Sequence, residues 1–217
     1  IPGTRARLGI VPTGLSNVLA RELGIRRDLS QAAAAIRTGA IRRIDLGTVN
    51  ERYFSLMVSI GLDAEAVRNV NPKLKRYLKR YAYHLSGLKS AFSFRPTPFS
   101  IAVDDGDGSR GRAAIISNSR FYGGPHQITP RARIDDGMLH CCLFEKAGLL
   151  DYLRYFWGVL RKTHHTYPDV TFLTGQTVTV DTPGLPLQAD GDYIGSTPAR
   201  IEILPRSLPV HVPECIE

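Results

Sequence analysis

The sequence is poor in cysteine and contains no long apolar run. Three cysteines in 217 residues, of which Cys141 and Cys142 are adjacent, are too few for a disulfide framework. With no secretory signal pattern at the first residues, this count predicts a reducing, cytoplasmic setting. No apolar run reaches the roughly 18 residues that a membrane-spanning helix needs. No C-x-x-C or H-E-x-x-H motif is present, which argues against a zinc site.

Acidic residues are absent from residues 66–103. This stretch carries eight lysines and arginines, as many as the net charge of +8 of the whole chain. It would attract the phosphate groups of a nucleotide or an anionic membrane, although a solvated helix face is the alternative. Interleaved aromatic residues would also suit stacking on nucleic-acid bases, but aromatics at helical spacing more often pack into a core. We therefore expect a membrane or a nucleotide as partner and disfavour nucleic acid.

Glycines and prolines divide most of the chain into short segments that alternate like β-strands. The pair 42–49 and 52–60 is expected to form a hairpin, as is the pair 99–103 and 112–117 around the acidic turn 104–108. Further strands are predicted at residues 8–11, 138–144, 171–174, 177–181, 187–189, 200–204 and 208–212. Such closely spaced strands are typical of an antiparallel sandwich or a flattened barrel.

Four segments have the periodicity or the composition of helices. They are residues 17–23, the alanine-rich stretch before Gly39, residues 72–94 and residues 149–160. Ser16 or Asn17 can cap the first, and Asp28 or Ser30 the second. The fold class is therefore α+β and mostly β, with inserted helices. One strand and one helix in roughly the first 25 residues cannot bury themselves alone, so they predict the tail of a preceding α/β unit, which the β-rich part of the chain follows.

Several short motifs combine glycine turns with polar side chains. A plain turn or a helix cap explains each motif taken alone, because Asp-Gly is the commonest hairpin signal. Their order along the chain is more informative than any single one. They are residues 12–17, 59–65, 117–137 and 189–192.

The order and spacing of these motifs resemble those of the diacylglycerol kinase and sphingosine kinase family, most closely its bacterial lipid kinase branch. The resemblance covers nearly the whole chain. The family's P-x-G-T-x-N turn corresponds to Pro12–Asn17, and R-x-I-D-L-G to Arg43–Gly47 after a shift of one position. The segment F-x-N-x-x-S-x-G-x-D-A corresponds to Phe54–Ala64. The pair S-N-x-x-x-Y-G-G and P-x-A-x-x-D-D-G corresponds to Ser117–Gly137, and D-G-E to Asp190–Asp192.

The chain departs from the family pattern at three places. Leu15 stands at a threonine position, and Asp192 at a glutamate position. The family's G-G-D-G-T nucleotide signature is missing and would lie upstream of Ile1. By this resemblance, residues 1–40 are the remaining end of an ATP-binding domain and residues 41–217 bind a lipid substrate. The chain alone would then be inactive.

The resemblance also implies roles for individual residues. Asp190 would be the general base, and Asp192 would orient it or bind magnesium through water. Asp63 and Glu65 would line the polar mouth of the lipid pocket. The implied nucleotide-binding residues are Gly14, Asn17, Lys75, Arg76 and Arg80, and the implied metal ligands are Asp135 and Asp136.

The implied function is transfer of the γ-phosphoryl group of ATP, with Mg²⁺ present, to the hydroxyl of a lipid. The enzyme would be cytoplasmic and peripheral to an anionic membrane, which residues 66–103 would contact. One alternative is a non-catalytic lipid-binding module. Another is a kinase of a soluble substrate related to NAD kinases. The motifs select neither the lipid, whether diacylglycerol, a sphingosine-like base or phosphatidylglycerol, nor an oligomeric state.

Overall fold

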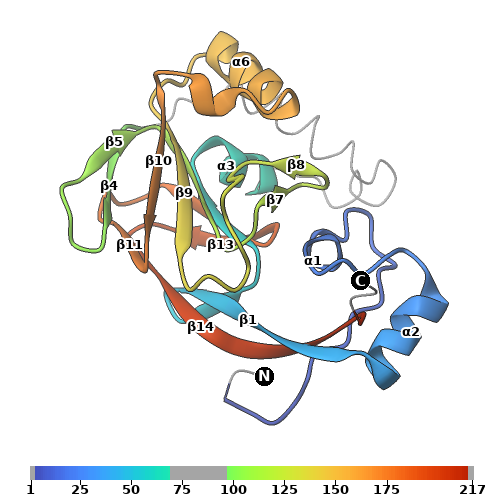
Figure 1. Cartoon of the computed structure of the whole chain (residues 1–217). Coiled ribbons are helices and arrows are strands. Elements are labelled where there is room, and N and C mark those ends of the chain that lie inside the picture. The colour runs from blue at the N-terminus through green and yellow to red at the C-terminus, as the bar shows by residue number, and fades with distance from the viewer. Residues whose placement is uncertain (1–2, 69–96, 215–217) are drawn as a thin grey trace.

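Two antiparallel sheets form the centre of the computed structural model, which describes residues 3–68 and 97–214 (Figure 1). The first contains, in spatial order, β2 (Arg52–Phe54), β1 (Ala40–Val49), β14 (Ala199–Val212), β11 (Thr177–Val180), β4 (Phe99–Val103) and β5 (Ser109–Gly111). The second contains β10 (Val170–Gly175), β9 (Leu139–Phe144), β6 (Ala113–Ser117), β3 (Met57–Ile60), β12 (Pro186–Ala189) and β13 (Asp192–Ser196). This architecture confirms the predicted α+β, mostly β class. The predicted helix at 72–94 lies outside the described residues.

The main hydrophobic core lies between the two sheets. Alternate residues of β11 and β14, such as Val178 and Ile201, meet Ile116 and Leu143 of the opposite sheet. β6 is buried along its whole length because both of its faces are covered. Ala114 and Ile116 face the inter-sheet core, whereas Ala113 and Ile115 belong to a second cluster under a helix. The continuous apolar run of β6 thus follows from its central position.

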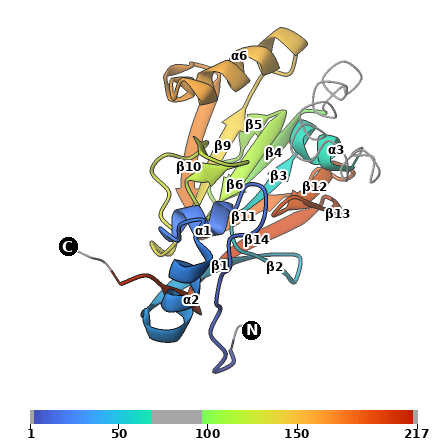
Figure 2. The same ribbon diagram turned by 90° about the vertical axis from the view of Figure 1, so that its right-hand side faces the viewer.

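β1 and β14 form a long curved ladder that reaches beyond the sandwich (Figures 1 and 2). The sequence predicted two strands at 200–204 and 208–212, but a single strand spans Ala199–Val212. The pairing register shifts between Ile44 and Leu46, opposite the bend near Arg206, whose φ is +50°. A β-bulge lets the ladder turn here without ending, which explains why the local sequence suggested a break.

Two helices pack on the outer part of this ladder. α1 (Val18–Glu22) and α2 (Leu29–Thr38) share a buried cluster with Ile44 and Val210. Asp28 caps α2 as predicted, accepting the N–H groups of Ser30 and Gln31 at 2.8 and 3.2 Å. These bonds, led by the one from the Ser30 hydroxyl, lower the pKa of Asp28.

The predicted strand at 8–11 is wrong. Only Leu8 pairs, through a single parallel bridge to Val210. Leu8 donates to the Pro209 carbonyl and accepts the His211 N–H, at 2.9 Å each, whereas Gly9 and Val11 are exposed. Pro12, which has no N–H group, follows at once and could not continue a ladder.

Both predicted hairpins switch sheets partway along. Asn50 and Glu51 turn the chain from β1 into β2 with left-handed φ angles of 44° and 71°, as the hairpin prediction requires. β2 ends at Phe54, however, and the chain crosses to β3 in the other sheet. Likewise β4 pairs with β5, and β6 lies in the second sheet. Alternation of polar and apolar residues indicates that one face of a strand is buried, but it does not indicate to which sheet the strand belongs.

The remaining helices cover the second sheet. α3 (Leu62–Arg68) follows β3 and contacts β12 and β13. α6 (Leu149–Leu160), with the bounds predicted, packs on β9 through Tyr155 and Phe144, and η1 (His164–Thr166) follows it. The two-stranded β7 (Phe121–Tyr122) and β8 (His126–Gln127) lie between α1 and α6. In the described part of the chain, no helix has the length and apolar character required to cross a bilayer.

Candidate functional site

In the motif Asp190-Gly191-Asp192, the first two residues form the turn of the β12–β13 hairpin and Asp192 begins β13. Asp190 and Gly191 have φ angles of 49° and 91°, the left-handed pair that a tight hairpin turn needs. The Asp190 carboxylate points back at the segment that joins β2 to β3. Its Oδ1 accepts the N–H groups of Leu56 and Met57 at 2.9 and 3.0 Å. Its Oδ2 accepts the N–H and the hydroxyl of Ser55 at 2.7 and 2.8 Å.

These hydrogen bonds occupy the four acceptor positions of the carboxylate. Three donors are backbone N–H groups, which the fold holds in place. The fourth, the Ser55 hydroxyl, is the only one that can leave by rotation of a side chain. The carboxylate is therefore oriented by the backbone and has one exchangeable position, at Oδ2.

The second carboxylate of the motif has a different environment. The Asp192 side chain is 69% exposed, and its nearest cation is Arg52, with Nη2 3.8 Å from Oδ2. Such an exposed pair contributes little to stability. Asp192 thus remains available to solvent beside the turn.

A buried polar network connects this turn to the predicted substrate residue Asp63. The Gly191 N–H donates to Gln188 Oε1 at 2.7 Å, and Gln188 Nε2 donates to Asp63 Oδ2 at 3.0 Å. The Ser59 hydroxyl donates to the same oxygen at 2.5 Å. Oδ1 of Asp63 accepts the Tyr122 hydroxyl. Burial, strengthened by the Asp63 charge, raises the pKa of Tyr122 well above 10, so Tyr122 stays a donor.

Glu65 lies on α3 two residues after Asp63. Its Oε2 lies 3.4 Å from Arg68 Nη1, three residues further along α3. The Arg68 guanidinium also lies 6.0 Å from the centre of the Tyr193 ring in β13. The structure thus places Glu65 at the contact between α3 and the hairpin.

The predicted nucleotide turn is a compact structure held by Asn17. Asn17 Nδ2 donates to the carbonyls of Pro12 and Gly14 at 3.1 and 2.8 Å. A Cβ on Gly14 would lie 2.8 Å from Asn17 Oδ1, so glycine fits best at this position. Asn17 directly precedes α1 but makes no side-chain cap, unlike the cap that the sequence predicted. Lys75, Arg76 and Arg80 lie outside the described residues.

Sequence reasoning missed the link between this turn and the second half of the chain. Only 1% of the side-chain surface of Glu22, at the end of α1, is exposed. Its carboxylate accepts the Ser119 hydroxyl at 2.8 Å and Arg120 Nε at 3.1 Å. Only the S-N motif, which precedes Ser119, indicated that the loop after β6 mattered.

The loop that holds Asp135 and Asp136 does not fit a magnesium ion shared by both carboxylates. Asp135 Oδ2 accepts Nε and Nη2 of Arg42 at 3.0 and 2.7 Å, so a guanidinium already neutralises it. Both oxygens of Asp136 lie near protein groups: Oδ1 accepts the Met138 N–H, and Oδ2 lies 3.0 Å from His140 Nε2. Oδ1 of Asp135 is buried without a hydrogen bond, and Arg133 Nε lies 3.8 Å from it. Among the described residues, no group of three or more His, Cys, Asp or Glu side chains could hold a metal ion, and the metal assignment stays a prediction from the resemblance.

The buried carboxylate of Asp45 organises the same loop. Its two oxygens accept the N–H groups of Gly137 and Arg206 at 2.7 and 2.6 Å. Asp45 lies at the bulge of β1, within the R-x-I-D-L-G motif. It therefore ties β1 to β14 and to the Asp135 loop.

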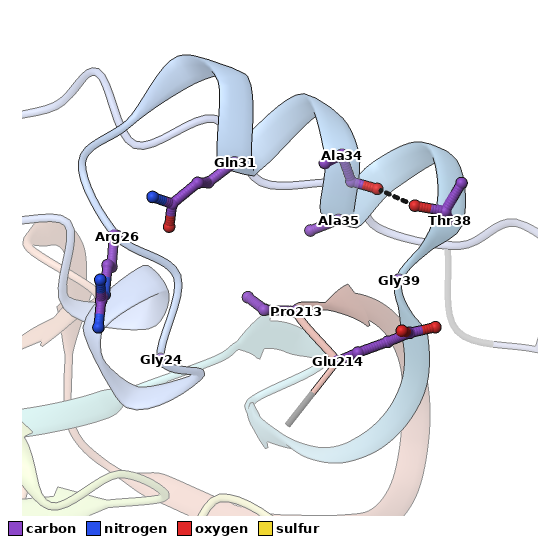
Figure 3. A pocket seen from close by; sticks show the side chains of 9 residues that line it. All are labelled: Gly24, Arg26, Gln31, Ala34, Ala35, Thr38, Gly39, Pro213 and Glu214. Atoms are coloured by element: carbon purple, nitrogen blue, oxygen red, sulfur yellow. Dashed lines mark hydrogen bonds between the residues drawn. The ribbon is translucent and has the colours of Figure 1, made fainter. Parts of the chain in front are cut away.

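A separate open pocket of about 540 Å³ lies between α2 and the end of β14 (Figure 3). In Figure 3, Gln31 and Ala35 of α2 face Pro213 and Glu214 across the pocket. The remaining lining residues are Gly24, Arg26, Ala34, Thr38 and Gly39. The pocket contains none of the predicted site residues.

The fold and the site together define a two-sheet β-sandwich with a charged hairpin turn, and comparison with known families specifies the class. The family model described as "YegS C-terminal NAD kinase beta sandwich-like domain" matches residues 56–212. The model described as "Diacylglycerol kinase catalytic domain" matches residues 2–49. The chain belongs to the bacterial diacylglycerol kinase family of YegS-like lipid kinases. The domain boundary at 40/41 stays a prediction.

Individual relatives agree with this assignment. The chain is 32% identical over 214 residues to a diacylglycerol kinase of Bacillus subtilis, covering 97% of this chain and 70% of the relative. It is 30% identical over 218 residues to one of Mycobacterium tuberculosis, with the same coverages. A solved diacylglycerol kinase structure from Bacillus anthracis superposes with a TM-score of 0.74 at 21% identity, over 96% of this chain and 69% of that one. This last likeness shows the fold.

Position 56 adds one departure from the family pattern. The F-x-N segment has asparagine where this chain has Leu56. The position contributes its backbone N–H to Asp190, which any residue except proline can do.

Proposed function

We propose that the protein transfers the γ-phosphoryl group of ATP to the hydroxyl group of a lipid such as diacylglycerol. The observation that carries this proposal is the Asp190 carboxylate, which three backbone N–H groups orient and which has one exchangeable acceptor position. A general base must lie within hydrogen-bond reach of the proton that it removes. A substrate hydroxyl that displaces the Ser55 hydroxyl from Oδ2 satisfies this condition.

In the proposed reaction the substrate oxygen attacks the γ-phosphorus as its proton passes to Asp190 Oδ2. The bond from the γ-phosphorus to the β,γ-bridging oxygen breaks, and ADP leaves with that electron pair. ATP enters as a substrate with its own Mg²⁺. Asp192 orients the reacting groups from the exposed side of the turn. The turn at Gly14 and Asn17 contributes to the nucleotide side.

The Asp63 network positions the polar part of the lipid in this proposal. Asp63 has donors from Tyr122, Ser59 and Gln188, and Gln188 also holds the Gly191 N–H. The network therefore fixes the distance between the polar mouth and the turn. Glu65 adds a second carboxylate on the same helix.

The test is phosphotransfer to diacylglycerol by the longest reading frame that contains this chain. Asp190→Asn should lower kcat by about 10²–10⁴-fold, the usual contribution of a general base. Ser55→Ala should keep kcat within a few-fold, because the substrate hydroxyl replaces the one that is lost. Asp107→Asn, in the exposed turn after β4, is the matched control and should equal wild type. Unchanged turnover by the Asp190→Asn protein would refute the base assignment.

The same assay decides between the alternative functions. Phosphorylation of NAD in place of lipid would support a soluble-substrate kinase, which the NAD kinase-like sandwich makes worth testing. Lipid binding without ATP turnover would support the non-catalytic module. Activity that depends on Asp190 and on a lipid hydroxyl would exclude both.

A further inference from the structure

We propose that the outer face of α6 is a docking surface for an anionic lipid bilayer. This inference rests on the proposed lipid substrate and adds the place where the protein meets the lipid phase. The docking face consists of Leu150, Leu153, Trp157 and Leu160. Their exposed fractions are 79%, 49%, 52% and 37%.

The spacing of these residues places them on one side of the helix. Steps of three, four and three residues keep side chains within a narrow stripe of an α-helix. Large apolar side chains exposed as a contiguous patch mark an interaction surface more often than scattered ones do. Figures 1 and 2 both show α6 at one end of the molecule, at the top of each view and away from α2.

The opposite side of α6 is firmly attached, so the helix presents the docking face as a rigid surface. The Tyr155 ring lies 4.7 Å from that of Phe144, and its hydroxyl donates to Asp169 at 2.8 Å. Arg154 also binds Asp169. Gly158 packs so closely that a Cβ there would lie 2.7 Å from the Tyr167 ring. The inner face alone thus attaches α6 to the protein, so the apolar residues of the outer face are not needed for that attachment.

The charges around the docking face select an anionic surface. No acidic residue occurs between Asp151 and Asp169, whereas Arg161 and Lys162 follow the helix and are exposed. The Arg161 guanidinium lies 4.7 Å from the centre of the Trp157 ring. Tryptophan beside a cation is typical of the membrane–water interface, where the ring and the charge face different media.

A second copy of the chain is a poorer occupant of the docking face than a bilayer. A two-fold interface apposes the same patch on both subunits, so the partner's α6 would offer the Arg161–Lys162 pair no negative charge except Asp151. Anionic headgroups attract those cations instead. The 12-residue helix is about 18 Å long at 1.5 Å per residue, so it would lie in the interface without crossing it.

Trp157 is the only tryptophan of the chain and so reports directly on the proposed contact. With vesicles of phosphatidylglycerol and phosphatidylcholine, its emission should shift to the blue, and bromine-labelled acyl chains should quench it. Vesicles of phosphatidylcholine alone should bind more weakly. The Leu150→Gln/Leu153→Gln protein should bind at least about tenfold more weakly, because transfer of one buried leucine corresponds to about that factor.

The matched control is Leu29→Gln, which removes a leucine that is 63% exposed at the start of α2. It should bind like wild type, and all three proteins should melt at the same temperature. The proposal is overturned if wild type does not bind the vesicles or if the double variant binds equally well. It is also overturned if the double variant converts a dimer into a monomer without changing vesicle binding.

Kinase assays keep this inference separate from the proposed function. With a short-chain, water-soluble diacylglycerol, the double variant should have the same kinase activity as wild type. Its activity on diacylglycerol in vesicles should fall. Vesicle binding that depends on α6 without any kinase activity would refute the function and support the docking face. Equal kinase activity of the double variant and wild type on vesicles would support the function and refute the docking face.

Discussion

Replacing Asp190 by asparagine should destabilise the protein as well as stop the proposed chemistry. The carboxylate closes the β12–β13 hairpin against the β2–β3 connection through bonds to Ser55, Leu56 and Met57. These residues are more than 130 positions away along the chain, since the separation from Ser55 is 135. Asp190 therefore joins two distant segments, which a purely catalytic residue need not do.

The size of the effect follows from the donors. An asparagine oxygen can accept two of the hydrogen bonds, but its amide group would then face the N–H groups that served the other oxygen. A hydrogen bond to a charged acceptor contributes about 1.5–3 kcal/mol, and two such bonds are lost. Because the turn is solvent-exposed, water satisfies part of the loss, and we expect about 1–3 kcal/mol.

Thermal unfolding followed by circular dichroism measures this loss. For a domain of this size the melting temperature falls by about 2–4 °C per kcal/mol. Ser55→Ala, which removes only the hydroxyl, should lose less than half as much as Asp190→Asn. The Asp107→Asn protein should have the same melting temperature as wild type. Equal melting temperatures for the Asp190→Asn and wild-type proteins would show that the four bonds contribute nothing and would refute this reasoning.

Two further predictions concern buried groups. Glu22→Gln should lower the free energy of unfolding by about 1–3 kcal/mol, because it weakens the hydrogen bonds that join α1 to Ser119 and Arg120. Hydrogen exchange of the α1 amides should then speed up, and unchanged exchange would contradict the link. Burial raises the pKa of Cys141 to about 12 and that of Tyr122 well above 10. In the unfolded chain the Cys141 thiol and the Tyr122 hydroxyl lose their protons from about pH 9 and pH 10, respectively. The folded protein keeps both protons, so its free energy of unfolding should fall as the pH rises from 9 toward 12. Each group contributes up to about 1.4 kcal/mol per pH unit. Melting temperatures from pH 8 to 11 test this, and Cys141→Ala should reduce the slope.

The sequence was most informative where local rules decide the structure. The N-cap Asp28 and the alanine run determine α2, and the apolar periodicity of residues 149–160 determines α6. The Asp-Gly pair at 190 and 191 predicted a hairpin turn, which the left-handed φ angles confirm. Each of these features depends on residues a few positions apart.

The sequence failed where the chain passes from one sheet to the other. β2 and β3 read as one alternating run, because each buries alternate residues in the same core. The break between them depends on the Asp190 bonds, and their donors are backbone groups that carry no sequence signal. For the same reason the motifs identified the neighbourhood of the site but missed Ser55, Gln188 and Glu22.

The motif that starts at Ser117 shows how a residue can belong to the site without facing a substrate. Asn118 Nδ2 donates to the carbonyls of Ser55 and Asp45, at 3.0 Å each. Ser55 in turn holds Asp190, while Ser119 binds Glu22 at the end of α1. One short loop thus contacts both the residue that orients the candidate base and the helix that follows the predicted nucleotide turn. The position of Asp190 relative to that turn therefore depends on Asn118, which explains physically why the S-N motif accompanies the D-G-D turn in this chain.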